Sequence, residues 1–378
     1  MIEYWSYLKE YKTEKKKILN LVDKVFKSGT LLLGKELKKF EKNYCKFNKS
    51  KFGLGVANGT DALFIALKSL GIGKNDEVIT VSNTAIPTVA AIVNTDAVVK
   101  FTDIGQDYLI DTSKITNLIN KKTKAIIVVH LFGQMCEMDT IMKIAKKHKL
   151  KVIEDCAQAT GAMYRGKKAG SVGDVGCHSF YPTKILGAYG DGGFLTTNNK
   201  SLFEKMHRYR FYGIDTLGVN KKWKNKYYSI DKGINSRLSE VQSIILNSKL
   251  SKIYTSINRR REIAKKYYAG LKNTSLQLPL INKGNFHVFH IFEVFHPKRD
   301  LIIKLMKERK IKLSIHYQYP IHKMTGYKYL VKNSKNFLKE TESKSRGIFS
   351  LPIYPSLKNK EIDLIISNLK KIIQNFNE

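Results

Sequence analysis

Apolar and polar positions along this chain form blocks of two kinds. Between residues 52 and 200, short β-rich runs are separated by longer stretches with apolar residues at i, i+3, i+4 and i+7, as at Leu63, Ala66, Leu67 and Leu70. The short runs predict strands at 53–57, 77–81, 98–102, 124–130, 151–154, 175–180 and 193–197. Strands and helices that alternate in this way predict parallel strands joined by crossover helices, and therefore an α/β domain.

The pattern differs on both sides of this region. Residues 9–48 have a charged helical pattern, which indicates a lead-in that packs on the main domain or on a partner. After about residue 240 a long helical pattern covers 240–272, and a strand at 288–295 and a helix at 300–310 follow. A closing helix is marked by Ile362, Ile365, Ile366, Leu369, Ile372 and Ile373. We predict a large domain with its lead-in over 1–245 and a smaller α+β domain over 246–378.

The formal net charge of +35 raises the question of a nucleic-acid partner. The lysines are spread over the whole length and lie mainly on the polar faces of predicted helices, as Lys143, Lys146 and Lys147 do. This distribution favours a solvated, lysine-rich surface, and no motif for nucleic-acid binding accompanies the charge. We therefore expect no nucleic-acid partner, although the same field attracts an anionic small molecule such as a sugar nucleotide.

No stretch of the sequence predicts a membrane span or a secretion signal. The longest apolar runs, such as 125–129, are far shorter than the roughly 20 residues that cross a bilayer. The first residues include Glu3 and lack a basic-then-apolar pattern, so we expect no membrane association and a cytoplasmic location.

The four cysteines are Cys45, Cys136, Cys156 and Cys177. They are scattered, with no Cys-x-x-Cys and no paired histidine spacing, which argues against a disulfide framework and against a zinc site. We expect no metal.

Two candidate ligand sites follow predicted strands. At 58–63 a strand ends and a helix begins, and the backbone N–H groups at a helix start bind anions. Gly59 permits close approach of an anion to the backbone, and Thr60 adds a hydroxyl. The simpler interpretation is that Asn58 or Thr60 only caps the helix. Asp155 ends another strand, where ligands of open α/β sheets bind, so it could hold a cation or a protonated ring nitrogen. Its simpler interpretation is also a helix cap.

Lys184 follows the stretch 179–183 and precedes the glycine-rich run 187–193. Taken alone, it is one lysine among many. Together, however, three features match what pyridoxal phosphate requires: the helix start at 58–63, the aspartate at a strand end and a lysine among small residues. A helix N-terminus binds the phosphate of this cofactor, a carboxylate faces its ring nitrogen, and a lysine forms a Schiff base with its aldehyde. The ordered set therefore predicts pyridoxal 5′-phosphate as the cofactor.

The sequence resembles a known family, the DegT/DnrJ/EryC1/StrS sugar aminotransferases, which use pyridoxal phosphate. The resemblance covers nearly the whole chain and rests on the motifs at 58–63, 130–134, 154–159, 179–184, 190–193, 233–242 and 316–322. It implies a fold of the aspartate aminotransferase type (fold type I), with a large, mostly parallel sheet domain and a smaller C-terminal α+β domain. It also implies that Lys184 binds the cofactor and that Asp155 faces its ring nitrogen.

The resemblance implies further site residues. Gly59, Thr60 and Ser179 would hold the cofactor phosphate, and Gln158 would contact the ring or its 3-hydroxyl. Asn235 matches a residue that reaches the phosphate from the neighbouring subunit, which implies a homodimer with shared active sites.

Two positions, Tyr317 and His322, fall where the family has its sugar-contacting loop. One position departs from the family: Ala85 stands where many members have an aromatic residue that stacks on the cofactor ring, so the sequence does not show what covers that face. A branch of the family with histidine in place of the lysine performs dehydration; the intact Lys184 favours amino transfer.

The resemblance implies a function. The expected enzyme is an aminotransferase that moves an amino group, by a ping-pong cycle, from L-glutamate to a nucleotide-linked keto sugar. The motifs at 83–88 and 130–134 look more like members that aminate C3 of a dTDP-linked 3-keto-6-deoxyhexose, for 3-amino-3,6-dideoxyhexoses of surface glycans. A C4 aminotransferase acting on a UDP-linked 4-keto-6-deoxy sugar is the alternative. A non-catalytic, regulatory family member would be expected to lose Lys184 or Asp155, and both are present.

Overall fold

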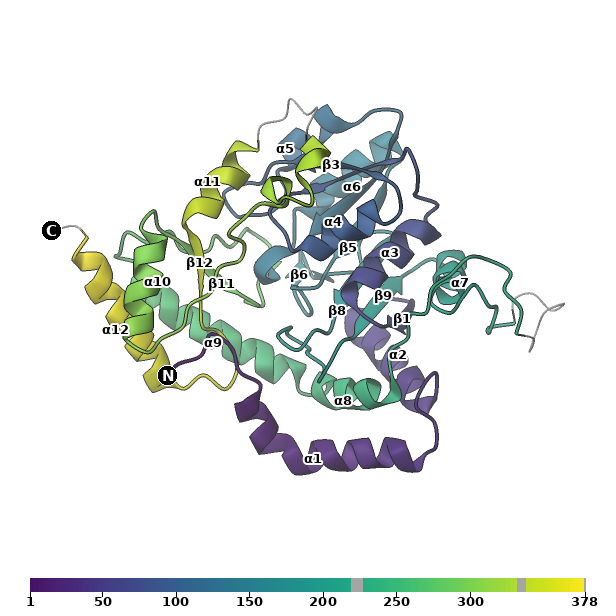
Figure 1. The fold of residues 1–378 in the computed structure, drawn as a ribbon, viewed down its shortest axis with the longest axis horizontal. Helices are drawn as coiled ribbons and strands as arrows, with labels where there is room; N and C mark the ends of the chain where they lie inside the picture. Colours follow the sequence, from purple (N-terminus) through teal and green to yellow (C-terminus); the bar gives the residue numbers. More distant parts are fainter. Residues whose placement is uncertain (219–226, 332–337, 377–378) are drawn as a thin grey trace.

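A large sheet with helices on both faces lies beside a smaller group of helices and strands (Figure 1). The computed structural model describes residues 1–218, 227–331 and 338–376. Among these residues, no helix is both long and apolar enough to cross a membrane.

The central sheet has the strand order β1-β9-β8-β5-β4-β2-β3. Its strands are β1 (Phe52–Val56), β2 (Glu77–Val81), β3 (Val98–Thr102), β4 (Thr123–Val129), β5 (Lys151–Asp155), β8 (Val175–Ser179) and β9 (Gly193–Thr197). Only β9 runs against its neighbours: it pairs antiparallel with β1 and β8, whereas the remaining pairs are parallel. The predicted α/β fold with a mostly parallel sheet is confirmed, and each predicted strand of this sheet matches an observed one to within one residue at either end.

Two apolar layers cover the sheet. Ile126 and Val128 of β4 face one layer and Ile127 faces the other, because successive side chains of a strand point to opposite faces. The first layer includes residues of α2 (Lys35–Asn48), α6 (Met138–His148) and α8 (Glu240–Leu250), and the second includes residues of α3 (Gly59–Ser69), α4 (Ile86–Val93) and α7 (Lys200–Tyr209). Coverage on both faces explains why the strands are nearly continuous apolar runs.

Shorter elements connect these layers. They are α5 (Thr112–Ile115), the 3-10 turns η1 (Thr116–Leu118), η2 (Leu131–Gly133), η4 (Ile321–Lys323) and η5 (Lys328–Val331), and a small sheet of β6 (Met163–Tyr164), β7 (Lys167–Lys168) and β10 (Asn285–Phe286).

The smaller domain is built around its own apolar cluster. Its elements are α9 (Ile253–Leu271), β11 (Phe292–Phe295), α10 (Arg299–Glu308), α11 (Lys339–Gly347), β12 (Ile348–Leu351) and α12 (Asn359–Gln374), with β11 and β12 paired antiparallel. The predicted C-terminal α+β unit is thus present.

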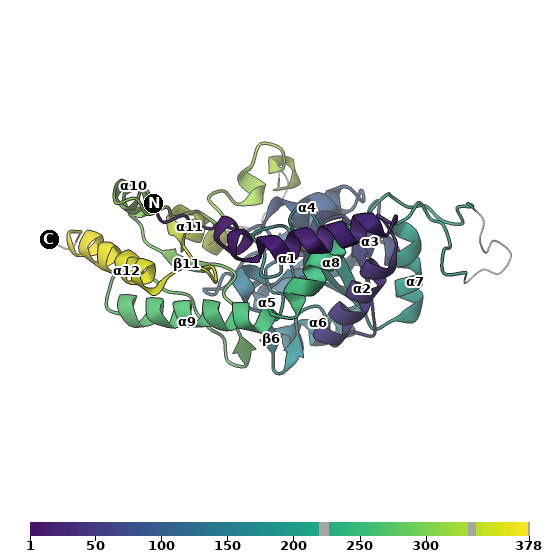
Figure 2. The ribbon, with the colours of Figure 1, turned by 90° about the horizontal axis from the view of Figure 1, so that it is seen from below.

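The N-terminal residues join the smaller domain before the chain enters the large one. Ile2 lies in the apolar cluster of the smaller domain, and its backbone bonds to Lys310 and Lys312 at 2.8 and 2.9 Å. The helix α1 (Leu8–Lys27) then crosses the molecule and packs on α8 (Figure 2). Ile2 thus packs with the smaller domain and residue 245 lies inside α8, and the division at 1–245 and 246–378 stays a prediction.

Two expectations need correction. The helical pattern at 240–272 is two helices, α8 and α9, separated at Ser251 and Lys252. The predicted strand at 288–295 is a strand only from Phe292, because the preceding residues bond to a loop instead: Val288 N–H donates to the carbonyl of Gly133 at 3.0 Å. Apolar periodicity alone does not separate a strand from a buried extended segment.

Candidate active site

The carboxyl ends of several parallel strands meet at one edge of the central sheet. The segments that leave β1, β2, β5 and β8 begin with Ala57, Ser82, Cys156 and Phe180. In open α/β sheets this edge is where ligands bind. Most predicted cofactor residues lie at or just after these strand ends, namely Gly59, Thr60, Asp155, Gln158, Ser179 and Lys184, whereas Asn235 lies between α7 and α8.

Lys184 lies in a tight loop after β8. Its backbone N–H donates to the carbonyl of Tyr181 at 2.8 Å, and a side chain at Gly187 would overlap the backbone of Pro182. The loop closes back on the sheet, since the Phe180 N–H donates to the carbonyl of Gly192 at 2.7 Å. Glycine is therefore required at position 187, and the closed loop fixes where the Lys184 side chain begins.

The electrostatic surroundings of Lys184 change its pKa. Burial lowers the pKa of the Lys184 amine to about 8, and the nearby charge of Asp155 acts in the opposite direction. An ordinary lysine has a pKa of about 10.4. A larger fraction of the Lys184 amine is therefore uncharged near neutral pH, as a nucleophile or base requires.

Asp155 is buried at the end of β5, with 6% of its surface exposed. Its carboxylate accepts from the Thr88 hydroxyl at 2.8 Å and from the backbone N–H of Ala157 at 3.1 Å. Burial raises the pKa of Asp155, and these two hydrogen bonds act against the rise. No helix begins after β5 before residue 163, so Asp155 is not the helix cap of the simpler interpretation.

Two threonines that we did not predict support Asp155. The hydroxyls of Thr84 and Thr88 lie 3.0 Å apart, and Thr88 continues to Asp155. Both threonines are buried beside the start of α4. Their i, i+4 spacing at a helix start directly after a strand is the sequence signal that could have found them.

The stretch 58–63 begins α3 as predicted. Asn58 is the cap, because its side-chain oxygen accepts from the Asp61 N–H at 2.8 Å. Thr60 lies within the first turn. A Cβ at Gly59 would lie 2.8 Å from the Cβ of Ser179, so the start of α3 and the end of β8 lie directly side by side, and only glycine fits at position 59 without displacing Ser179.

Gln158 joins the sheet edge to the smaller domain. Its side-chain oxygen accepts from the Phe132 N–H at 2.8 Å, and its NH₂ group donates to the Tyr317 hydroxyl at 2.9 Å. Gln158 is buried, and Tyr317 is partly buried. The structure therefore brings together Asp155, Gln158, Lys184 and Tyr317.

The other predicted residues lie further out. His322 is buried, and its two ring nitrogens are engaged by Ser82 at 2.7 Å and Glu342 at 3.0 Å. Its role in sugar binding stays a prediction. Asn235 is exposed in the single chain, where its backbone pairs with Phe211. Ala85 is partly exposed directly before α4, at the same sheet edge as Asp155.

A buried polar cluster beneath the site is satisfied by the protein itself. The nitrogen Nε2 of His130 lies 2.9 Å from the Glu154 carboxylate, which also accepts from the N–H groups of Gly170, Val172 and Gly173. The other ring nitrogen accepts from the Cys136 N–H at 3.2 Å. The cluster therefore has a structural role, because it holds residues 170–173 against the end of β5.

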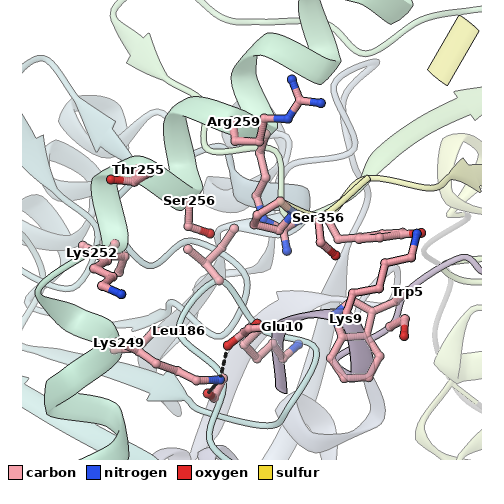
Figure 3. Close-up of a pocket in the computed structure, with 18 of the residues that line it drawn as sticks. Trp5, Lys9, Glu10, Leu186, Lys249, Lys252, Thr255, Ser256, Arg259 and Ser356 are labelled. Atoms are coloured by element: carbon pink, nitrogen blue, oxygen red, sulfur yellow. Dashed lines mark hydrogen bonds and ion pairs between the residues drawn. The ribbon is translucent and has the colours of Figure 1, made fainter. Parts of the chain in front are cut away.

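Two cavities meet at Lys184. The smaller has a volume of about 170 Å³ and is lined by Gln158 and Tyr317 among others. The larger has a volume of about 720 Å³ and lies between α1 and α9, where Figure 3 shows Trp5 and Lys9 opposite Ser256 and Arg259. Lys184 lines both cavities.

Comparison with known proteins decides the family. The family model described as "DegT/DnrJ/EryC1/StrS aminotransferase family" matches residues 12–370. The chain belongs to this family. The predicted aminotransferase activity class and the aspartate aminotransferase type of fold are thereby confirmed.

Individual members are similar over nearly their whole length. A dTDP-3-amino-3,4,6-trideoxy-alpha-D-glucose transaminase of Micromonospora megalomicea subsp. nigra is 43% identical, covering 98% of each chain. A dTDP-3-amino-3,6-dideoxy-alpha-D-galactopyranose transaminase of Aneurinibacillus thermoaerophilus is 41% identical, covering 94% of this chain and 95% of its own. A UDP-N-acetyl-3-dehydro-alpha-D-glucosamine 3-aminotransferase of Acidithiobacillus ferrooxidans is 34% identical, covering 94% of each.

Solved structures agree with this assignment. DesV of S. venezuelae, solved with a ketimine intermediate, superposes with a TM-score of 0.93 at 32% identity, covering 98% of each chain. NtdA of Bacillus subtilis, solved with its cofactor PMP, superposes with a TM-score of 0.87 at 29% identity, covering 96% of this chain and 82% of its own.

Proposed function

We propose that this chain binds pyridoxal 5′-phosphate at Lys184 and transfers an amino group from L-glutamate to C3 of a dTDP-linked 3-keto-6-deoxyhexose. The product is a 3-amino-3,6-dideoxyhexose for surface glycans. The observation that carries the proposal is the buried Asp155 beside Lys184, whose hydrogen-bond donors, Thr88 and Ala157, are both neutral. A buried carboxylate is stabilised by a cation, which a protonated ring nitrogen supplies.

The residues present fit the cofactor. The start of α3, with Gly59 close to Ser179, suits a phosphate, since N–H groups at a helix start favour anions. Thr60 adds a hydroxyl at the same helix start, and Gln158, which bonds to Tyr317 of the smaller domain, would contact the ring or its 3-hydroxyl. When bound, pyridoxal phosphate supplies an electron sink for the carbon that loses its proton.

Lys184 and Asp155 then have distinct tasks. Asp155 would face the ring nitrogen and keep it protonated through its charge, and Thr88 holds the carboxylate in place. Lys184, whose pKa is lowered to about 8 by burial, would hold the cofactor aldehyde and would serve as the general base for the proton shift. Both tasks depend on the sheet edge that positions these groups.

Two cavities of different size suit two substrates that use one lysine in turn. The larger, at about 720 Å³, has room for a nucleotide-linked sugar, and the smaller, at about 170 Å³, for an amino acid. Ligand sites commonly have volumes of about 300–1,000 Å³. Alternation of donor and acceptor at Lys184 gives ping-pong kinetics.

The choice of sugar rests on relatives. The two dTDP-sugar transaminases at 43% and 41% identity are named for amino groups at C3. The relative at 34% identity is named for a UDP-linked substrate, so the nucleotide requires a direct test. The alternative, C4 amination of a UDP-linked 4-keto-6-deoxy sugar, belongs in the same test.

The test uses the purified, cofactor-loaded protein. It is incubated with L-glutamate and, separately, with dTDP-linked 3-keto and UDP-linked 4-keto sugars, and each amino sugar is analysed by NMR. Amination at C3 of the dTDP-linked sugar is expected. Amination only at C4 of the UDP-linked sugar would reject the C3 assignment in favour of the alternative, and the absence of any amino sugar would reject both.

Asn235 leads us to propose a homodimer with shared sites. Its side chain is exposed in the single chain and is available to a second copy. If Asn235 completes the partner's phosphate site, mixing Lys184→Ala and Asn235→Ala subunits by co-expression creates hybrids with one intact site. Such hybrids should exceed the activity of either variant alone. Equal activity of hybrids and variants would contradict the shared site.

A further inference from the structure

The smaller cavity is lined on one side by four residues of the smaller domain, here called the small-domain wall: Arg260, His290, His316 and Tyr317. Lys184 lines the same cavity from the large domain. The described residues that line the cavity include no aspartate and no glutamate. Its lining therefore presents two cationic side chains and no acidic one.

Arg260 occupies an unusual position on its helix. It lies on the apolar stripe of α9, three residues after Ile257 and three before Ile263, and only 3% of its surface is exposed. Its Nη1 donates to three backbone carbonyls, those of Phe289, His290 and Ile353, at 3.3, 3.2 and 2.6 Å, while its Nε has no partner among the described residues. The guanidinium is thus held by neutral oxygens only.

Other buried arginines in the chain are neutralised. Arg210 lies 2.6 Å from the carboxylate of Glu41, and Arg299 lies 2.9 Å from that of Asp300. The acid whose charge acts on Arg260, Glu10, is itself paired with Lys249 at 2.7 Å. A buried charge without a paired ion is costly, and a carboxylate that binds the guanidinium removes much of that cost.

The two histidines of the wall are neutral, and one of them has a free ring nitrogen. Burial lowers the pKa of His316 to about 4 and that of His290 well below its usual value, and the charge of Lys184 acts in the same direction on both. Nδ1 of the buried His290 has no hydrogen-bond partner among the described residues. A neutral imidazole with a free nitrogen can hydrogen-bond a ligand that enters the cavity.

We propose that Arg260 is a binding residue for the carboxylate of the amino donor, which enters the smaller cavity while its amino group lies toward Lys184. This inference rests on the proposed aminotransferase function. The smaller cavity has room for an amino acid, whereas a sugar diphosphate with its base needs the larger one. Arg260 lines both cavities, but the larger one also contains Glu10, Glu14 and Glu262, whereas the smaller one contains no acidic residue. An anion that binds Arg260 is therefore favoured in the smaller cavity, which has room for a carboxylate.

The probe for the test is glutarate, a dicarboxylate that has no amino group and cannot react. Its binding to the cofactor-loaded full chain is measured by isothermal titration calorimetry. Replacing Arg260 by Gln should weaken glutarate binding about 10- to 100-fold, because hydrogen bonds to charged groups are lost. The Michaelis constant for L-glutamate should rise with it, and binding of dTDP should change little.

Arg259→Gln is the matched control. Arg259 is the neighbouring residue of α9, lines only the larger cavity, and pairs with Glu262 at 3.2 Å. It should leave glutarate binding within about twofold of wild type, as expected for a partly exposed ion pair. Unchanged glutarate binding in Arg260→Gln, or an equal loss in the control, would overturn the proposal. A loss of dTDP binding as large as the loss of glutarate binding would overturn it in favour of a diphosphate site.

Arg260→Gln also loses carbonyl contacts and can fail to fold, which circular dichroism reveals. In that case the decisive measurement is a crystal structure of the wild-type protein with glutarate. A carboxylate within hydrogen-bond distance of Arg260 supports the proposal, and glutarate bound elsewhere overturns it. Failure of the proposed function is a separate result, because it appears as missing amino transfer by the wild-type protein.

Discussion

The two sides of the candidate site are built in different ways. The sheet-edge side, with Gly59, Asp155, Ser179 and Lys184, comes from short segments that directly follow parallel strands. The small-domain wall comes from one helix and two irregular segments. The first side has the groups that we assign to the cofactor, and the second has the groups that we assign to the donor. The comparison teaches that the fold itself places cofactor chemistry, whereas substrate recognition depends on how a second domain is attached.

Loss of Lys184 should have the largest effect. Lys184→Ala should lower amino transfer by about 10⁴-fold or more, because the lysine both holds the cofactor and moves the proton. The control Lys266→Ala removes a lysine of α9 that pairs with Asp363 at 3.3 Å and lines neither cavity, and it should stay near wild type. Initial rates with L-glutamate and the keto sugar measure both. Comparable losses in the two variants would show that the sheet edge is not special.

Asp155→Asn should come next. The amide keeps the shape and loses the charge that faces the ring nitrogen, so the rate should fall by about 10²- to 10³-fold, as for other preorganised electrostatic groups. Single-turnover kinetics with L-glutamate isolate this half of the cycle. A rate within threefold of wild type would contradict the role assigned to Asp155.

The hydrogen bond from Thr88 to Asp155 can be tested by a smaller change. Thr88→Val removes the hydroxyl that donates to the carboxylate and keeps the side-chain shape. Since burial already raises the pKa of Asp155 and this hydrogen bond opposes the rise, the pKa should go up further in the variant. Activity that needs the ionised carboxylate should then be lost at a higher pH, with about a tenfold lower rate on the acid side.

A pH–rate profile measures this shift. Thr84→Val, which removes the hydroxyl beside Thr88 and not the one on Asp155, should shift the acid limb less. An acid limb that stays in place in Thr88→Val would show that the hydrogen bond does not tune Asp155.

Several of these residues could be predicted from the sequence, for a physical reason. Groups such as Asp155 and Gly59 sit next to strands whose apolar runs are easy to recognise, and the sheet edge then brings them together. Arg260 could not be singled out in the same way. It lies in a run of three arginines, and its burial depends on the carbonyls of residues 289, 290 and 353, which are distant in sequence.

The missed features of the fold have the same origin. The interruption between α8 and α9 carries no glycine or proline at Ser251 and Lys252, so local signals do not mark it. The position of Ile2 in the smaller domain depends on pairing with residues 310–312. Local sequence patterns do not reveal such long-range pairing.

The smallest expected effect concerns a contact between the large domain and α11 of the smaller domain. Asp103 is buried after β3, and its carboxylate accepts from the N–H groups of Glu340 and Thr341 and from the Thr341 hydroxyl at the start of α11. Asp103→Asn should lower the free energy of unfolding by about 1–3 kcal/mol, with little change in the rate of amino transfer. Thermal unfolding at several pH values measures it.

The pKa of Asp103 determines how this difference in stability depends on pH. Burial alone would raise the pKa of Asp103, but its hydrogen bonds from Thr341 and Glu340 lower the pKa below the ordinary value. The stabilisation is therefore complete above the unfolded-state pKa of about 3.9 and is lost as the pH falls through the lower folded-state value. The difference between wild type and Asp103→Asn should shrink in acid, and a difference that is constant with pH would contradict this origin.

The most direct test of the central claim follows the visible absorbance of the cofactor-loaded protein through both half-reactions. With L-glutamate alone the absorbance should change in a single turnover, and addition of the dTDP-linked keto sugar should restore it. Lys184→Ala, loaded in the same way, should not complete this cycle. A wild-type protein whose absorbance does not respond to L-glutamate, or a Lys184→Ala variant that cycles normally, would contradict the account.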